Sequence, residues 1–253
     1  MRTGGCGRWY GRCGDARMTY PIGEKPPPSL RQPLRVELFF LAHSETGERL
    51  ASLAAAGVAL AGAVLIDELL RPVERIRVVE RRVFVTSLSV SGDPVADWAV
   101  GLLAGPVTRS AFAPPRQPLP VRDAIRALAA DAYERTAAGM YAGNLIVQSS
   151  HRRIMRGRRR YPPTDPNVLP RIRGRLNSTL IGSTRPDPQT DALGGLILAL
   201  DLVSELYLDG SGRDVRGLLG HMVDRIGTEG PTTRLVLDET DHLIGEAAVP
   251  VYG

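Results

Sequence analysis

Lysine, aromatic residues and cysteine are scarce in this 253-residue chain. Lys25 is the single lysine among 32 basic residues, and aromatic residues make up only 5% of the sequence. The core must therefore be built from Leu, Val, Ile and Ala, within the 43% of residues that are hydrophobic. The two cysteines, Cys6 and Cys13, both lie near the start. This usage excludes a small secreted scaffold held together by disulfides.

The first 33 residues contain no apolar stretch of the kind that marks a secretory signal. We therefore expect the protein in a reducing cytoplasm; Met18 offers an alternative start. A long apolar run occurs later, where Leu50 to Ile66 gives seventeen uncharged residues. As a helix this run would be about 26 Å long, shorter than the roughly 30 Å of a bilayer core. It is also rich in Ala and Gly, so it predicts a buried core helix rather than a transmembrane one.

Catalytic constellations are also lacking. The four histidines, His43, His151, His221 and His242, stand at no metal-ligand spacing, and the serines lack a nucleophile-elbow context. His221 and His242 could be gathered with Asp224 and Asp241, but solvated or core histidines are far more common. The sequence predicts no enzyme, no cofactor and no metal site.

The net charge of +5 is distributed unevenly. Residues 1–33 carry +4, while residues 151–175 carry nine arginines against Asp165 alone, or +8. The rest of the chain is left at −7. A compact basic patch on an acidic body indicates a polyanionic partner more strongly than an even basic surplus would.

The hydrophobic pattern predicts a mainly α fold with one or two β-hairpins. Residues 1–33 read as a disordered basic leader, residues 34–230 as a single helical domain, and residues 231–253 as a segment that the pattern does not assign. Leu34 to Ala42 predicts a short apolar helix, and Leu50 to Leu70 the buried helix. The β-branched residues between Val73 and Thr86 predict a hairpin.

Five further helices are predicted, and three Asp-Pro pairs provide start signals, the first of them for a helix that begins at Asp93-Pro94. In Asp93-Pro94, Asp165-Pro166 and Asp187-Pro188, the aspartate accepts orphan N–H groups, while the proline lacks the donor that would be orphaned. The expected helices after the first of these pairs cover residues 120–142, 165–181, 187–207 and 213–226. On the helix over 165–181, Arg171 and Arg175 lie away from the apolar stripe and are expected to face solvent.

Residues Asn144 to Tyr161 predict a protruding β-hairpin arm with an unusual charge. No acidic residue lies between His151 and Thr164 to neutralise it. We interpret the arm as binding an anion through Arg152, Arg153, Arg156, Arg158, Arg159 and Arg160. Ile154 and Met155, in the middle of the arginines, are candidates for insertion at a membrane interface, where each basic residue contributes about 1 kcal/mol. A solvated charge run and a purely oligomeric contact are the alternative interpretations.

The order of several segments resembles the GPP34 (Golgi phosphoprotein 3-like) family, in its bacterial type, over residues 34–226. These segments are Leu34–Ala42 with the Gly47 turn, Leu60–Leu69, Ala132–Arg135 before Gly143–Leu145, Tyr161-Pro162 with Asp165-Pro166, and Pro186–Pro188. The resemblance implies a single, mostly helical domain that associates peripherally with membranes. In the eukaryotic members it implies phosphatidylinositol 4-phosphate as ligand, self-association through the hairpin, and recruitment of Golgi enzymes and coat proteins.

The headgroup-binding residues that the resemblance implies are replaced in this chain. The family's tryptophan before the long buried helix corresponds to Ser52, and its arginine inside that helix corresponds to Ala61. Its arginine pair before the hairpin corresponds to Ala129-Ala130 and Ala132-Tyr133. None of these side chains binds phosphate as arginine does. The expected function is therefore a non-enzymatic adaptor at the inner face of a membrane, binding acidic lipid through the arm.

Two other functions stay open. A helix followed by an Arg-rich hairpin also describes a winged helix, with residues 120–142 as recognition helix and 145–161 as wing. Asp123, Asp131 and Glu134 make that helix a poor complement for nucleic acid phosphates. The remaining alternative is a scaffold whose hairpin mediates homo-oligomerisation.

Overall fold

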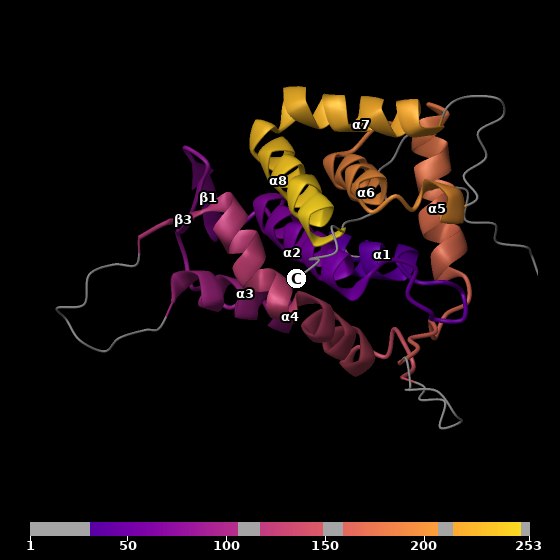
Figure 1. Ribbon diagram of the computed structural model, residues 1–253, viewed down its shortest axis with the longest axis horizontal. Helices are drawn as coiled ribbons and strands as arrows, with labels where there is room; N and C mark the ends of the chain where they lie inside the picture. The colour runs from indigo at the N-terminus through magenta and orange to yellow at the C-terminus, as the bar shows by residue number, and fades with distance from the viewer. Residues whose placement is uncertain (1–30, 106–116, 149–158, 207–214, 249–253) are drawn as a thin grey trace, which may run out of the picture. The chain divides into compact units, whose positions relative to one another are not determined.

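The computed structural model describes residues 31–105, 117–148, 159–206 and 215–248, and the residues from Gln32 onward form one compact unit. Eight α-helices and a small antiparallel sheet make up the described part (Figure 1), which confirms the predicted mainly α fold class. The helices are α1 Leu34–Leu41, α2 Leu53–Leu69, α3 Pro94–Ala104, α4 Val121–Ala142, α5 Val168–Leu180, α6 Pro188–Ala199, α7 Val215–Glu229 and α8 Pro231–Ala248. The strands are β1 Ile76–Val79, β2 Arg82–Val85 and β3 Leu119–Pro120, and a short 3-10 helix covers Val203–Leu206.

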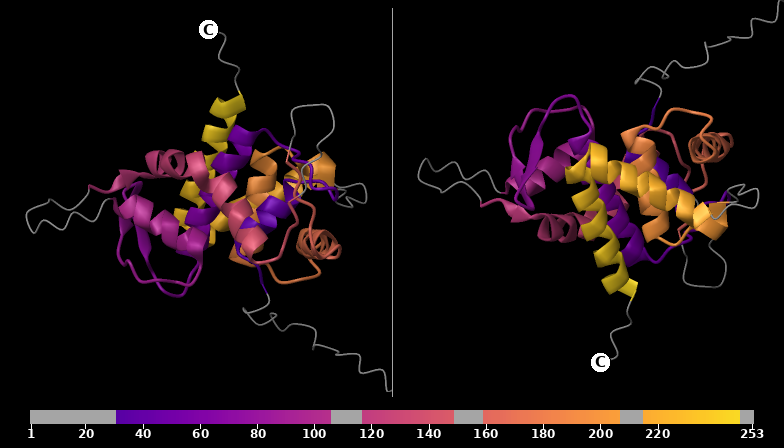
Figure 2. Two further views of the ribbon diagram at one scale, coloured as in Figure 1. Left: turned by 90° about the horizontal axis from the view of Figure 1, so that it is seen from below. Right: turned by 90° about the horizontal axis from the view of Figure 1, so that it is seen from above.

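Helix α2 forms the centre of the core, as its apolar sequence predicts. It begins after Ser52, whose hydroxyl accepts a hydrogen bond from the N–H of Ala55 at 3.1 Å, and every residue from Ala55 to Ile66 is buried. The helices α1, α4 and α8 pack around it (Figure 2). Among the described residues, no helix combines the length and apolar character needed to cross a bilayer.

Close approach of α8 to α2 depends on Gly62. A Cβ atom at this position would lie less than 3.0 Å from the side-chain oxygen of Thr240, on α8. The Thr240 hydroxyl is turned back onto its own helix, where it donates to the carbonyl of Val236 at 2.7 Å. Thr240 itself is fully buried. The two helices therefore meet where Gly62 faces Thr240, a polar residue whose hydroxyl already has a hydrogen-bond partner.

The first hairpin is confirmed where it was predicted. Strands β1 and β2 pair in antiparallel register, with Val79 opposite Arg82 across a two-residue turn. Both turn residues, Glu80 and Arg81, have positive φ angles of 49° and 60°. This left-handed backbone matches the twist of a two-residue hairpin. Strand β3 pairs with β2 and leads into α4.

Four predicted helix boundaries are wrong by three residues or more. Helix α2 begins at Leu53 and not at Leu50, and α7 ends at Glu229 and not at 226. Helix α5 begins at Val168 and not at 165, because Asp165 uses its carboxylate to accept the N–H of Asn167 at 2.9 Å and forms a turn before the helix. The helix predicted over 187–207 ends at Ala199, because Asp201 adopts a φ of 54° that breaks it.

Helix α8 was not predicted, although it closes the core. Its buried side chains are Thr233, Val236, Leu237, Thr240, Leu243 and Ile244. Two threonines in this stripe weaken the hydrophobic periodicity that reveals a helix in a sequence. The periodicity of α4 is clearer, because its buried residues Val121, Ile125, Leu128, Ala132 and Met140 follow the 3.6-residue helical period.

Candidate anion-binding surface at the base of the arginine arm

The structure describes only part of the predicted site. Arg159 and Arg160 lie among the described residues, at the end of the arm. The other predicted site residues, Arg152, Arg153, Ile154, Met155, Arg156 and Arg158, lie outside them. What the structure does define is the arm base, by which we mean residues 144–148 and 159–164 together with the side chains that hold them.

The two sides of the arm base are joined by antiparallel backbone pairing. The N–H of Val147 donates to the carbonyl of Pro162 at 2.9 Å, and the N–H of Thr164 donates to the carbonyl of Leu145 at 3.0 Å. Ile146 and Pro163 form an isolated antiparallel bridge between these bonds. The two described sides of the arm base therefore lie next to each other in antiparallel pairing.

A glycine turn after α1 seats the arm base on the body. The N–H of Tyr161 donates to the carbonyl of Gly47 at 3.0 Å. Gly47 has a φ of 79°, and a Cβ atom on it would collide with the backbone of Tyr161 and Pro162. Only glycine fits both the left-handed backbone and the close approach.

An aromatic cluster of Phe39, His43, Tyr133 and Tyr161 lies beneath the arm base. His43 stacks on Phe39 with ring centroids 4.2 Å apart, and Tyr161 meets His43 edge-on at 5.9 Å. His43 Nδ1 donates to the carbonyl of Phe39 at 2.7 Å, so the neutral ring leaves Nε2 to accept from the Tyr133 hydroxyl at 2.8 Å. Burial lowers the pKa of His43 to about 4. The cluster thus holds a neutral imidazole at physiological pH.

The described arginines of the basic segment are paired with carboxylates from other elements. Sequence reasoning found no acid near Arg159 and Arg160, but Glu134 and Glu48 reach them from α4 and from the turn after α1. Arg171 pairs with Asp165, and Arg173 with Glu45. Of the nine arginines in residues 151–175, the four whose pairing is not described are Arg152, Arg153, Arg156 and Arg158.

The prediction that Arg175 faces solvent is wrong. Its side chain is only 28% exposed, and its guanidinium lies 2.5 Å from the carboxylate of Glu37, which is 2% exposed. Gln189, on α6, donates to the same carboxylate at 3.3 Å. Arg175 therefore ties α5 to a buried acid of α1, because an unpaired carboxylate there would be costly.

Two exposed apolar side chains lie in the arm base or directly before it in the sequence. Tyr141, in the last turn of α4, is 58% exposed, and Val147, on the outgoing side of the arm, is 49% exposed. A tyrosine with an apolar ring and a polar tip suits the boundary between lipid and water. Basic, aromatic and aliphatic groups therefore occur together around this point of the surface.

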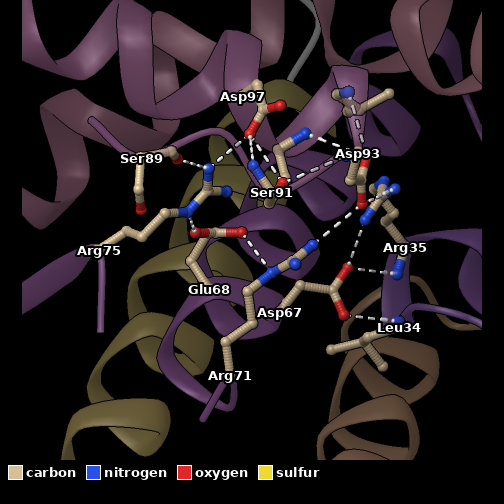
Figure 3. Close-up of polar contacts among 12 residues, drawn as sticks. Leu34, Arg35, Asp67, Glu68, Arg71, Arg75, Ser89, Ser91, Asp93 and Asp97 are labelled. Carbon is tan, nitrogen blue, oxygen red and sulfur yellow. Dashed lines mark hydrogen bonds and ion pairs between the residues drawn. The ribbon is translucent and has the colours of Figure 1, made fainter. Parts of the chain in front are cut away.

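A buried ionic cluster at the other end of α2 was missed by sequence reasoning (Figure 3). Arg35 lies at its centre, with its guanidinium 3.0 Å from Asp67 and 2.6 Å from Asp93, and its side chain is 6% exposed. Arg75 contacts Glu68 at 2.8 Å and Asp97 at 2.5 Å. Arg71 links the two halves, with contacts to Glu68 at 2.7 Å and Asp93 at 3.0 Å.

The ionic cluster is a structural joint rather than a binding site. Its members come from α1, α2, the segment before β1 and α3, and partners up to 58 residues apart meet in it. Burial raises the pKa of Asp67, although Arg35 opposes the effect. Burial also acts to raise the pKa of Asp97, but hydrogen bonds from Ser91 and Arg75 outweigh it and bring the value to about 2. The cluster could not be predicted from the sequence, because Asp93 was already explained as a helix cap.

Two of the positions that the resemblance aligns with headgroup-binding residues, Ser52 and Ala61, have structural roles in the described fold. Ser52 caps α2, and Ala61 is fully buried. Ser52 lines an open groove between α2, α6 and α8 whose described lining includes the carboxylates of Asp201, Asp241 and Glu246 and neither arginine nor lysine. Within the described residues, no three metal-ligating side chains of His, Cys, Asp or Glu come together.

Comparison with known proteins agrees with this architecture. No curated protein sequence matches the chain. A family model described as Golgi phosphoprotein 3 (GPP34) matches residues 34–240, from the first residue of α1 into α8. The match spans most of the chain and includes the arm and the residues of the ionic cluster. The protein therefore belongs to the Golgi phosphoprotein 3 (GPP34) family.

Proposed function

We propose that this protein is a non-enzymatic adaptor that attaches peripherally to the cytoplasmic face of a membrane and binds anionic lipid through its arginine arm. The observation that carries the proposal is the separation of charge at the arm. Arg159 and Arg160 are paired at the arm base, whereas Arg152, Arg153, Arg156 and Arg158 share a stretch of sequence without any acid. Family membership supports the same function, since the resemblance implies peripheral membrane association.

The arm base supports this role mechanically. Backbone pairing at Val147 and Pro162 and the Gly47 contact fix where residues 149–158 leave the body. Tyr141 and Val147 add apolar area beside that point. Ile154 and Met155, between the arginines, supply apolar side chains that can enter the lipid boundary. We propose that Arg159 and Arg160 position the arm and that the other four arginines bind the lipid phosphates.

Vesicle flotation with matched charge variants tests the proposal. The arm variant replaces Arg152, Arg153, Arg156 and Arg158 with glutamine, which lowers the net charge from +5 to +1. The control makes the same charge change at the exposed Arg126, Arg135, Arg185 and Arg216. With about 1 kcal/mol from each arginine near an anionic surface, the arm variant should partition roughly 1,000-fold more weakly into vesicles that contain phosphatidylserine. The control should bind like the unaltered protein.

Other outcomes would redirect the function. Equal losses in both variants would mean that only net charge matters, and the arm would lose its assigned role. The described arginines of α4 already argue against a winged helix, because Arg122 and Arg126 pair with Glu246 and Arg135 with Asp131. Duplex DNA binding with a steep salt dependence would nevertheless favour it. A change of particle mass in the arm variant, without lipid binding by either protein, would favour the oligomeric scaffold.

A further inference from the structure

A row of exposed apolar side chains runs along β2 and the segment that follows it, far from the arm base. Phe84 is 39% exposed, Leu88 56% and Val90 84%, and Val79 of β1 adds a side chain that is 45% exposed. We call these four residues the outer row. The first hairpin and the arm base lie toward opposite ends of the body in Figure 1. Several apolar side chains this exposed within one short stretch of the fold are a candidate interaction surface.

The outer row is held rigidly by the residues between its members. The N–H of Ser87 donates to the carbonyl of Arg75, and the carbonyl of Ser89 accepts from the guanidinium of Arg75 at 2.9 Å. Ser91 donates to Asp97 through both its N–H, at 2.9 Å, and its hydroxyl, at 2.7 Å. Ser87, Ser89 and Ser91 are thus bonded to Arg75 and Asp97 of the ionic cluster, and Figure 3 shows these contacts for Ser89 and Ser91. The side chains of Leu88 and Val90, which alternate with the serines, are exposed.

Cations occupy the same outward face as the apolar side chains. In the register of the hairpin, Arg77 lies directly opposite Phe84, and Val79 lies directly opposite Arg82. Arg77 is paired with Glu74, whose carboxylate lies 2.5 Å from its guanidinium. Arg82 donates to a neutral carbonyl, that of Pro118, at 2.9 Å. Behind the row, Asp93 and Asp97 are neutralised by the arginines of the ionic cluster. The face therefore combines protruding aliphatic groups with guanidinium groups beside them.

We propose that the outer row is a second membrane-contacting surface, which inserts Leu88 and Val90 into the interfacial region of an anionic bilayer while Arg82 meets the lipid phosphates. This inference rests on the proposed function, because it adds a contact to the same membrane association. Its energy comes mainly from burying apolar area, which added salt does not screen. The outer row therefore keeps its contribution to membrane binding at salt concentrations that weaken binding by the arginine arm.

The shape of the surface favours lipid over a protein partner. Protein interfaces centre on anchor side chains that fill well-packed pockets, whereas Val90 protrudes with 84% of its surface in solvent. A bilayer accepts such a protrusion without a preformed pocket. The backbone N–H groups of Ser87, Ser89 and Ser91 already have partners, so shallow insertion leaves these donors satisfied.

A fluorophore at Val90 tests the inference directly. In a background with Cys6→Ser and Cys13→Ser, Val90→Cys is labelled with an environment-sensitive dye and mixed with phosphatidylcholine vesicles containing 30% phosphatidylserine. We expect a blue shift on binding at Val90→Cys, and none for the same dye at Ala247→Cys, an exposed position of α8. In 0.3 M NaCl, the unlabelled variant Leu88→Ser with Val90→Ser should partition about 10- to 100-fold more weakly than the unaltered chain.

The outcomes separate this inference from the function on which it rests. Vesicle binding without a dye shift at position 90 would overturn the membrane role of the outer row and leave that of the arm intact. The row would then be a surface for a protein. Failure of the unaltered chain to bind any vesicle would overturn both. Equal thermal unfolding of the serine variant and the unaltered chain would show that a lost contact is not a folding defect.

Discussion

The guanidinium of Arg35 forms ion pairs with two carboxylates that belong to different helices. Its guanidinium lies between Asp67, at the end of α2, and Asp93, the cap of α3. Both acids are desolvated, so their charges depend on this arginine and its neighbours. A buried pair stabilises little compared with an apolar replacement of both partners, but removal of one partner strands the other.

Replacing Arg35 with methionine should therefore lower the free energy of unfolding by about 3–5 kcal/mol, because Asp67 and Asp93 lose their shared cation. Urea unfolding followed by circular dichroism measures this. The matched control is Arg171→Met at a side chain that is 67% exposed, where the loss of a surface pair should cost less than about 1 kcal/mol. Equal effects of the two changes would contradict the assignment of the ionic cluster as a joint.

The neutral His43 predicts a pH dependence of stability. Burial depresses its pKa to about 4, against an ordinary value of 6.5. In the unfolded chain the imidazole takes up a proton as pH falls below 6.5, whereas the folded chain resists it until about pH 4. Folding stability contributed by His43 is therefore complete above pH 6.5 and declines between pH 6.5 and 4, by at most about 1.4 kcal/mol per pH unit.

Urea unfolding between pH 8 and pH 4 measures the effect. His43→Gln should be less stable at pH 8, because the ring packing is lost, but its stability should fall less steeply below pH 6.5. His221→Gln, at an exposed position of α7, is the control and should keep the original slope. If His43→Gln kept that slope as well, another group would be responsible.

At the scale of whole elements, the contact of α2 with α8 is specified by matched sizes. Gly62→Ala should destabilise the protein by about 1–3 kcal/mol, because the added methyl group meets the side chain of Thr240. Thr240→Ala removes the two atoms that lie closest to it. The double variant should therefore cost less than the sum of the two single changes, and a double-mutant cycle by urea unfolding measures the difference. Strict additivity would mean that the two positions do not touch.

The helices and strands that could be predicted from the sequence are those that follow from a pattern of neighbouring residues. Helix α2 was visible from its continuous apolar run, α4 from its 3.6-residue stripe, and the first hairpin from its β-branched residues. Helix α8 lacked such a stripe because Thr233 and Thr240 occupy buried positions. The end of α6 was missed because Asp201 breaks the helix with a left-handed backbone that aspartate adopts only occasionally.

The candidate site was less predictable than the fold, because its contacts join distant residues. The arginine arm is evident in sequence as a charge run. Its neutralised base is not, since Glu48 lies 112 residues from Arg160 and Glu37 lies 138 residues from Arg175. The ionic cluster likewise brings together acids and arginines from four segments. Charge counting along the chain overstates the exposed positive charge wherever folding supplies such partners.

At the scale of the whole molecule, the body carries two differently built surfaces. The arm base presents a basic segment of sequence on a backbone fixed by pairing, and the outer row presents aliphatic side chains held by a buried ionic joint. Under the proposed function, added salt would weaken membrane binding by the first surface and leave the apolar contact of the second. Together, the two surfaces would make attachment depend on the charge of the membrane and on how loosely its lipids pack.

The packing of α8 on α2 also has a consequence for synthesis. Thr240 emerges from the ribosome roughly 180 residues after its partner Gly62, which at 5–20 residues per second takes roughly 10–40 s. Throughout that interval the apolar helix α2 lacks the segment that finally covers it. A nascent chain of this protein is therefore a client for ribosome-associated chaperones until its last helix has been translated.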